Sequence, residues 1–265
     1  MAELASYERA QLRAIERWKA EPPGIIAQAA GVALAPVAWV ARRIVPAAAI
    51  ETALAAGHAI ARDTAGARDI LERARAASVA ELRARPLDVC DSLADAMHSR
   101  AVGAATVEGA ASGVMGLAAA PIDVPAMIVL ALRTVHRIGM CYGFEGAAEG
   151  GERFALAVLS AACANSMAEK KQALGMLAAT LEWSSAAEMA AGRQLGREAT
   201  IVAIRTLARQ LSANTAKRRA LSAVPVLGAA TGAAVNGGFI NDVAWAARRA
   251  FQERWFAARA VSERV

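Results

Sequence analysis

Three side chains that could contact an anion cluster in one apolar segment of the sequence. Arg133, His136 and Arg137 are the only charged or titratable residues within residues 127–139. In a helix, Arg133 and Arg137 lie one turn apart on one face, and His136 is predicted to share that face. Guanidinium groups match phosphate oxygens in charge and geometry. The three residues could therefore form a cationic notch for a lipid phosphate or another anion.

The same three residues also have a structural interpretation. A buried arginine needs a charged partner. The carboxylates considered for that role are Asp123, Glu145, Glu152 and Asp242. Because acidic residues flank the segment on both sides, ion pairs at a helix junction are the favoured interpretation, and anion binding is the alternative.

Arginines and aromatic residues are interleaved near the C-terminus. The residues concerned are Trp245, Arg248, Arg249, Phe251, Arg254, Trp255 and Phe256. Such a segment can insert at a membrane interface, which makes Arg248 and Arg249 candidate contacts for lipid. Core packing of a terminal helix explains the aromatic residues equally well.

No recognisable catalytic or metal-binding pattern occurs in the sequence. His58, His98 and His136 are far apart and lack the spacing of zinc-binding motifs. The chain has no GxSxG nucleophile motif, phosphate-binding loop or dinucleotide-binding glycine motif. Cations between residues 193 and 219 lack the interleaved aromatic residues of a nucleic-acid-binding segment. We therefore expect no enzyme activity, no cofactor, no metal and no nucleic-acid partner.

Composition predicts an all-α fold. Of the 265 residues, 72 are alanine, which has the highest helix propensity. No segment alternates apolar and polar residues clearly enough to predict a strand. The net charge is +6, with 26 arginines against four lysines. This excess suits phosphate contact, although a GC-rich genome produces the same bias. Three widely spaced cysteines, Cys90, Cys141 and Cys163, indicate a reducing compartment and buried thiols.

Two glycine-rich segments share a pattern at a fixed separation. Gly109 and Gly113 form one pair, Gly228 and Gly232 form the other, and an Asp-Val dipeptide follows each at the same distance. Small residues one helical turn apart allow close helix packing. We expect a single compact multi-helix domain with two Gly/Ala-rich helical hairpins packed centrally in pseudo-symmetry. Chance is the alternative in a chain this rich in alanine and glycine.

Helix ends are predicted from residues that flank these runs. Asp123 and Asp242 are predicted to cap the helices that follow the two runs, with Pro125 in the first turn of the earlier one. Gly143 is predicted to end that helix. Residues 237–238, both glycine, predict a broken or re-entrant helix in the second run.

Two uncharged runs, residues 22–41 and 220–241, are long enough to cross a bilayer as helices. Both contain many small residues, so buried or interfacial helices are favoured over spans. Residues 1–21 are predicted to be an amphipathic helical arm, loosely attached to a domain of residues 22–265. The N-terminal residues show no signal peptide, so the expected location is cytoplasmic, peripheral on the inner face of the cell membrane.

The chain resembles the bacterial EcsC family over most of its length. The most specific segments are residues 127–139 (MIVLALRTVHRIG), 141–145 (CYGFE) and 152–154 (ERF), followed by 224–229 (VPVLGA), Asn236, 242–246 (DVAWA) and 16–19 (ERWK). Glu145 stands where the family more often has aspartate. The family is named for a protein encoded beside an ABC transporter, and it is distantly similar to senescence-type domains of lipid-droplet-associated proteins. The resemblance implies lipid or membrane contact and carries over no catalytic residues.

Two functional hypotheses follow. The first is a non-enzymatic helical protein that associates peripherally with membrane or binds a lipid or acyl-chain ligand, in support of an ABC transporter or another envelope process. The second is a soluble helical adaptor that binds a membrane transporter or another protein through its small-residue surfaces. Vesicle binding by the purified protein separates the two hypotheses. Neither one fixes an oligomeric state.

Overall fold

The computed structural model describes residues 5–23, 47–115, 120–145, 151–181, 200–212 and 228–262. Within these ranges the chain forms helices joined by turns and contains no strand, so the predicted all-α fold is confirmed. The labelled helices are α1 (Ser6–Ala20), α4 (Ala47–Ala65), α5 (Arg68–Ala74), α6 (Val79–Leu82), α7 (Leu87–Met115), α8 (Ala120–Cys141), α9 (Gly151–Ala162), α10 (Met167–Leu181) and α12 (Gly228–Ser262). Residues 200–212 form a further helical segment.

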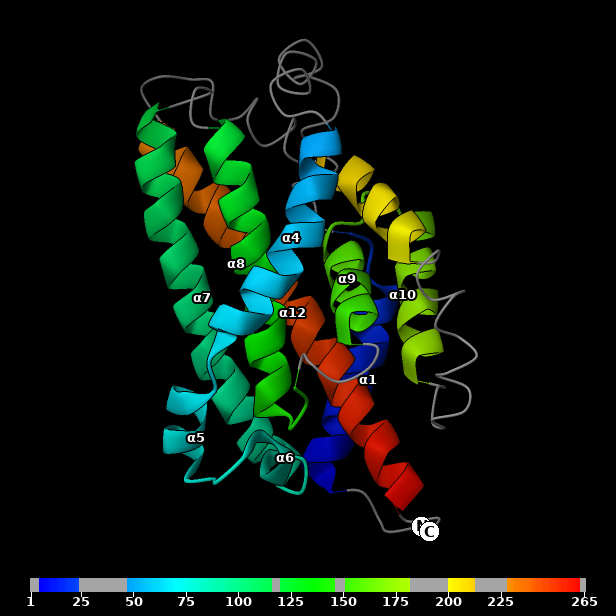
Figure 1. Ribbon diagram of the computed structural model, residues 1–265. Coiled ribbons are helices and arrows are strands. Elements are labelled where there is room, and N and C mark those ends of the chain that lie inside the picture. Colours follow the sequence, from blue (N-terminus) through cyan, green and yellow to red (C-terminus); the bar gives the residue numbers. More distant parts are fainter. Residues whose placement is uncertain are drawn as a thin grey trace.

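Three long helices, α7, α8 and α12, pack against one another, with α7 at the left edge of the view in Figure 1. Helix α12 packs most extensively against α7 and also contacts α8 and α9, while α4 packs against α8. Helices α9 and α10 form a second pair, and α1 contacts α12 and α10. The start of α4, the end of α7 and the starts of α8 and α12 lie at one end of the bundle, the upper end in Figure 1.

The predicted caps at Asp123 and Asp242 are wrong. Helix α8 begins at Ala120, so Asp123 lies in its first turn, and Asp242 lies well inside α12. Two prolines precede the apolar part of α8, and Pro121 rather than Pro125 occupies the first turn, where a missing N–H group costs little. In α12, helix formation continues through both glycines at 237–238, so the predicted break in this helix is also wrong.

The glycines of α12 have a packing role instead. A Cβ atom added at Gly237 would lie 2.6 Å from Thr106 Oγ1 on α7, so this position requires glycine for close approach of the two helices. The two Gly/Ala-rich runs therefore meet where α7 and α12 cross, one turn from the predicted packing residue Gly109, which is buried. The side-chain surroundings of Gly113, Gly228 and Gly232 lie outside the described residues. Their packing role, and the pseudo-symmetry, stay predictions.

The end of α8 is formed by Gly143, as the sequence predicts. Gly143 has a φ of +83°, and the N–H groups of Phe144 and Gly143 donate to the carbonyls of Gly139 and Met140, each at 3.0 Å. This pair of hydrogen bonds is a Schellman motif, which satisfies carbonyls at the helix end. A Cβ atom at Gly143 would also collide with the backbone nitrogen of Arg83.

We expect Gly143→Ala to destabilise the protein by about 2 kcal/mol, because both the positive φ and the contact with Arg83 backbone oppose a side chain. Urea unfolding followed by circular dichroism measures the change. The matched control is Gly175→Ala in α10, where nothing lies within 4 Å of the added carbon. Equal stability changes in the two variants would contradict this account of Gly143.

A buried carboxylate joins the helices at the lower end of the bundle. Asp91 of α7 is 2% exposed and accepts hydrogen bonds from Tyr142 Oη at 2.5 Å, Tyr7 Oη at 2.7 Å and Gln252 Nε2 at 2.8 Å. The donors come from α1, the turn after α8, and α12. Burial and the nearby Asp91 charge raise the pKa of Tyr142 well above its ordinary value, so both phenols remain hydrogen-bond donors.

The N-terminal arm packs onto the rest of the protein through α1. Ile15 is 1% exposed, and Lys19 forms an ion pair with Glu253 of α12 at 2.6 Å. Lys170 of α10 donates to the backbone oxygens of Trp18 and Glu21. These contacts hold α1 against α12 and α10, so this part of the arm is firmly rather than loosely attached.

One described segment is long and apolar enough to cross a membrane, Val124–Cys141 of α8. Two-thirds of it is buried inside the protein, which is also typical of the central helix of a globular fold. Residues 24–41 of the first predicted run and residues 220–227 of the second lie outside the described residues.

Candidate functional site

A groove between α7 and α8 contains two of the predicted anion contacts, Arg133 and Arg137. Its volume is about 270 Å³. It is lined by Asp69, Met97, Arg100, Ala101, Ala104, Leu130, Arg133, Thr134 and Arg137. Three guanidinium groups thus share the groove with one carboxylate, and its remaining walls are mainly apolar.

Arg137 has the structural role that the sequence favours, but with a different partner. It donates to the Asp69 carboxylate at 2.5 Å and to the backbone oxygens of Ala65 and Gly66 at 2.6 and 3.0 Å. Arg100 contacts the same carboxylate at 2.6 Å. Burial disfavours the charged carboxyl, but the two guanidinium groups outweigh it and lower the pKa of Asp69. The predicted partners Asp123, Glu145, Glu152 and Asp242 are not the ones that Arg137 uses.

Arg133 differs from Arg137 in its surroundings. Its side chain is exposed and makes no hydrogen bond or ion pair with another residue that the structure describes. Asp69 is the one carboxylate lining the groove, and Arg100 and Arg137 already share it. The groove therefore has a net positive charge, and the Arg133 guanidinium is left without an ion-pair partner among the described residues. Such an arrangement favours an anion with several oxygen acceptors.

His136 does not belong to this groove, so the predicted three-residue notch is wrong at this position. Its side chain is 3% exposed and packs edge-to-face on His58 of α4, with ring centroids 4.9 Å apart. Successive residues of an α-helix are about 100° apart, so His136 faces α4 while its neighbour Arg137 lines the groove. Among the residues that the structure describes, His136 Nε2 and His58 Nδ1 have no hydrogen-bond partner. Burial, then the neighbouring His58 and Arg62, lower the pKa of His136 to about 4.

Arg248 and Arg249 of α12 lie beside Trp245 in a different part of the protein. Arg248 is buried, forms an ion pair with Asp95, and stacks 4.5 Å from the centre of the Trp245 ring. Arg249 donates to Gln11 Oε1 and Gln252 Oε1, both at 2.8 Å, and lies 5.2 Å from the same ring. Arg248 therefore has a structural role in an ion pair, whereas the hydrogen-bond partners of Arg249 among these contacts are all neutral.

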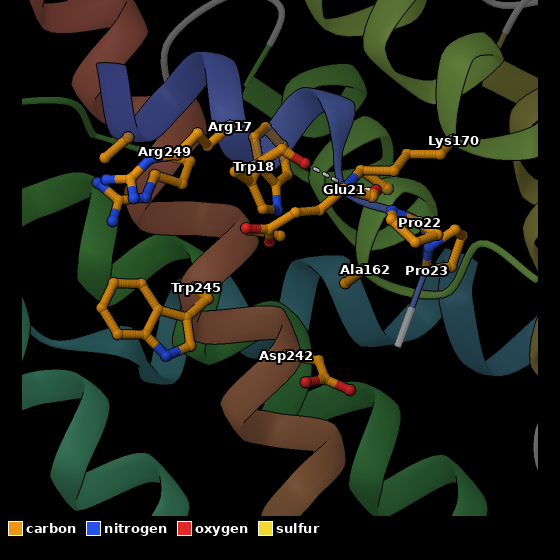
Figure 2. A pocket seen from close by; sticks show the side chains of 13 residues that line it. Arg17, Trp18, Glu21, Pro22, Pro23, Ala162, Lys170, Asp242, Trp245 and Arg249 are labelled. Carbon is orange, nitrogen blue, oxygen red and sulfur yellow. Dashed lines mark hydrogen bonds between the residues drawn. The ribbon is translucent and has the colours of Figure 1, made fainter. Parts of the chain in front are cut away.

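Arg249 lines a second and larger pocket, of about 470 Å³, between α1, α9, α10 and α12 (Figure 2). Its lining residues are Ala14, Arg17, Trp18, Glu21, Pro22, Pro23, Ala161, Ala162, Lys170, Asp242, Trp245, Ala246 and Arg249. The volume is in the range of small-molecule sites. Sequence reasoning missed this pocket because its members come from three segments, 14–23, 161–170 and 242–249, which are far apart in the chain.

The second pocket has a buried lysine behind one of its tryptophans. Lys170 is 4% exposed, and its ammonium group lies 5.1 Å from the centre of the Trp18 ring. Its hydrogen bonds go to backbone oxygens of Trp18 and Glu21. Burial lowers the pKa of Lys170, although the charge of Glu21 opposes that shift. Lys170 thus fixes the end of α1 and adds positive charge to the pocket wall.

Metal-binding geometry is absent from the described part of the chain. Among these residues, no group of three His, Cys, Asp or Glu side chains is placed to hold a metal ion. The three cysteines are buried, as predicted. Both pockets therefore consist of cations, carboxylates and aromatic or aliphatic walls.

Comparison with known proteins identifies relatives of this chain. The EcsC protein family matches residues 9–256, nearly the whole length. A protein from Bacillus subtilis (strain 168), named uncharacterized protein YdbA, is 38% identical over 68 residues, which is 26% of this chain and 25% of that protein. The match thus spans about a quarter of YdbA. No solved structure matches the chain.

Proposed function

The chain belongs to the EcsC protein family, and on that premise we propose that it is a non-enzymatic protein that binds lipid phosphate and associates peripherally with membranes. The observation that carries the proposal is the groove between α7 and α8. Arg100, Arg133 and Arg137 line it together with a single carboxylate, Asp69. An exposed and uncommitted guanidinium at Arg133 is suited to contact a headgroup phosphate.

The surface beyond the groove supports the same proposal. Between residues 101 and 111 of α7, the exposed positions are Gly103, Ala104, Val107 and Ala111, and Val107 is 73% exposed. Exposed positions of α4 between residues 48 and 60 are likewise uncharged, ending at Ile60 and followed by Arg62. Among the described side chains of residues 48–60, 101–111, 124–132 and 233–241 in this end of the bundle, only two are charged, and both are half-buried. They are Glu51 and Glu108.

Three exposed arginines lie at a similar height along the bundle axis. Arg62, Arg100 and Arg133 each lie roughly 14 residues from the helix end at the upper end of Figure 1, a distance of about 20 Å. Beyond that level the described exposed side chains of α4 and α7 are uncharged. Cations beside an apolar surface are the pattern of a protein that rests on an anionic bilayer.

We expect Arg133→Glu to reduce co-flotation with phosphatidylglycerol vesicles by about tenfold. The substitution replaces a cation that has no partner among the described residues with a carboxylate, which the anionic lipid repels. Thermal unfolding of this variant should match that of the wild type, since Arg133 has no described partner to lose. The matched control is Arg205→Glu, an exposed arginine in residues 200–212 that changes net charge equally. An equal loss of binding in the two variants would show a nonspecific charge effect and reject the groove as the contact site.

Charge reversal at Arg137 should have a different outcome. Arg137→Glu places a carboxylate against Asp69 and removes two hydrogen bonds to backbone oxygens, so we expect a loss of about 3 kcal/mol in stability. Urea unfolding measures it directly. Full stability of this variant would contradict the structural role of Arg137.

A further inference from the structure

The pocket beside Trp18 and Trp245 has lining groups of both charge signs. Cations are Arg17, Lys170 and Arg249, and carboxylates are Glu21 and Asp242. Figure 2 shows Arg17, Trp18 and Glu21 coming from α1 and its end, and Asp242, Trp245 and Arg249 coming from α12. The two indoles and several small alanine side chains also line the pocket. This mixture differs from the groove between α7 and α8, where the cations predominate.

Two of the pocket's guanidinium groups have hydrogen-bonding capacity to spare. Arg17 is exposed and makes no side-chain hydrogen bond or ion pair with another described residue. Arg249 uses one of its terminal nitrogens for two glutamine oxygens and forms no ion pair with a carboxylate among the described residues. A guanidinium carries five N–H donors, so most of the donors of these two residues remain available to an oxyanion.

The opposite charge is available in the same pocket. Glu21 ends α1 in an extended backbone conformation, and its carboxylate makes no hydrogen bond or ion pair with another described residue. Arg17 stands four positions earlier, at the spacing that commonly forms a helical ion pair, yet the two side chains are not paired. Asp242 adds a second carboxylate to the lining, and indole faces attract ammonium groups.

We propose that this pocket binds a small zwitterion in which an ammonium group is joined to a phosphate, as in a phosphoethanolamine unit. Arg17 and Arg249 contact the phosphate, while Glu21 contacts the ammonium group, which lies against the indoles of Trp18 and Trp245. Lys170 is a positioning residue that holds the Trp18 and Glu21 backbone oxygens. The source is either a lipid headgroup or a free phospho-amine. This site is separate from the groove proposed to contact the membrane.

Three water-soluble probes test the proposal without any membrane: phosphoethanolamine, inorganic phosphate and ethanolamine. Binding is followed by tryptophan fluorescence and isothermal titration calorimetry with the full chain. We expect phosphoethanolamine to bind at least about tenfold more tightly than either of the other two, because only the zwitterion satisfies both charge signs. Vesicles of phosphatidylethanolamine in phosphatidylcholine then distinguish a lipid headgroup from a free ligand, through competition with soluble phosphoethanolamine.

Substitutions in the pocket separate the two halves of the ligand. Glu21→Gln should lower affinity for phosphoethanolamine about tenfold and leave inorganic phosphate unchanged, whereas Arg17→Gln should weaken both phosphate-containing probes. Matched controls on α1 are Glu16→Gln and Arg13→Gln, which are exposed and do not line the pocket. All four changes replace exposed side chains, so the fold is retained, and thermal unfolding verifies that.

Three results would overturn the proposal. One is absence of binding for all three probes up to about 10 mM, which corresponds to less than about 3 kcal/mol of binding free energy. Another is equal affinity for inorganic phosphate and phosphoethanolamine, which would make the pocket an unselective anion site. The third is an effect of Glu16→Gln as large as that of Glu21→Gln. None of these results bears on vesicle binding through Arg133.

Discussion

Replacement of Asp91 by alanine is expected to lower the free energy of unfolding by about 4 kcal/mol, because it leaves buried donors without an acceptor. Tyr142 Oη and Gln252 Nε2 are both buried and both donate to this carboxylate. Tyr7 Oη of α1 is a third donor. Loss of the acceptor therefore weakens the attachment of both α1 and α12 to α7. Urea denaturation measures the resulting decrease in the free energy of unfolding.

The matched control for this prediction is Asp88→Ala, an exposed carboxylate one turn earlier on α7. Its expected effect is below about 1 kcal/mol, since only a first-turn interaction with the helix dipole is lost. A double-mutant cycle of Asp91→Ala with Tyr142→Phe should show a coupling of at least about 1 kcal/mol. Additive effects in that cycle, or a loss for Asp91→Ala no larger than for Asp88→Ala, would contradict the buried network.

Acid is expected to destabilise the protein in the window between pH 6.5 and about 4, through the pair His58–His136. Burial lowers the pKa of His136 from 6.5 to about 4, so the folded protein holds this imidazole neutral while the unfolded chain protonates it. The stability that comes from holding His136 neutral is therefore fully present above pH 6.5 and is lost as the pH falls toward 4. For a shift of this size the loss is about 3 kcal/mol.

The surroundings of the pair determine the sign of this effect. The pKa of His58 is also lowered, first by burial, and Arg62 adds to that shift while Glu152 opposes it. Urea unfolding at a series of pH values measures the slope. His136→Leu removes one titrating imidazole and should make the slope shallower between pH 6.5 and 4. An unchanged slope in this variant would contradict the assignment of acid sensitivity to His136.

The sequence predicts the helical class and one helix end correctly because those depend on local chemistry. Alanine content and the absence of strand patterns reflect backbone propensity, which acts over a few residues. Gly143 ends α8 because glycine at a positive φ completes a hydrogen-bonding motif confined to six residues. The family resemblance was likewise correct, since it rests on short segments with specific side chains.

Helix starts were harder to predict because two signals compete. Asp123 and Pro125 together predict a start at 123, but Pro121 serves equally well, and α8 begins at Ala120. In α12, glycine at 237 lowers helix propensity, yet packing against Thr106 of α7 needs a residue without Cβ. Tertiary contact thus outweighs the local cost of about 1 kcal/mol per glycine.

Partners of the site residues could not be predicted, since they come from distant parts of the chain. Arg137 pairs with Asp69, which precedes it by 68 residues, whereas the sequence offered closer carboxylates. Helical periodicity placed Arg133 and Arg137 on one face but could not show that His136 turns toward α4. Lys170 meets Trp18 across 152 residues, and neither residue belongs to a recognisable motif.

Co-flotation of the wild-type protein with lipid vesicles tests the central claim most directly. The purified chain is mixed at low salt with vesicles of phosphatidylcholine alone or with phosphatidylglycerol added, and its position in a density gradient is measured. Lipid-phosphate binding through arginines predicts flotation with the anionic vesicles and its loss as salt rises, because screening weakens the attraction. Absence of flotation with anionic vesicles at low salt would contradict membrane association and would favour a soluble adaptor that binds a protein partner.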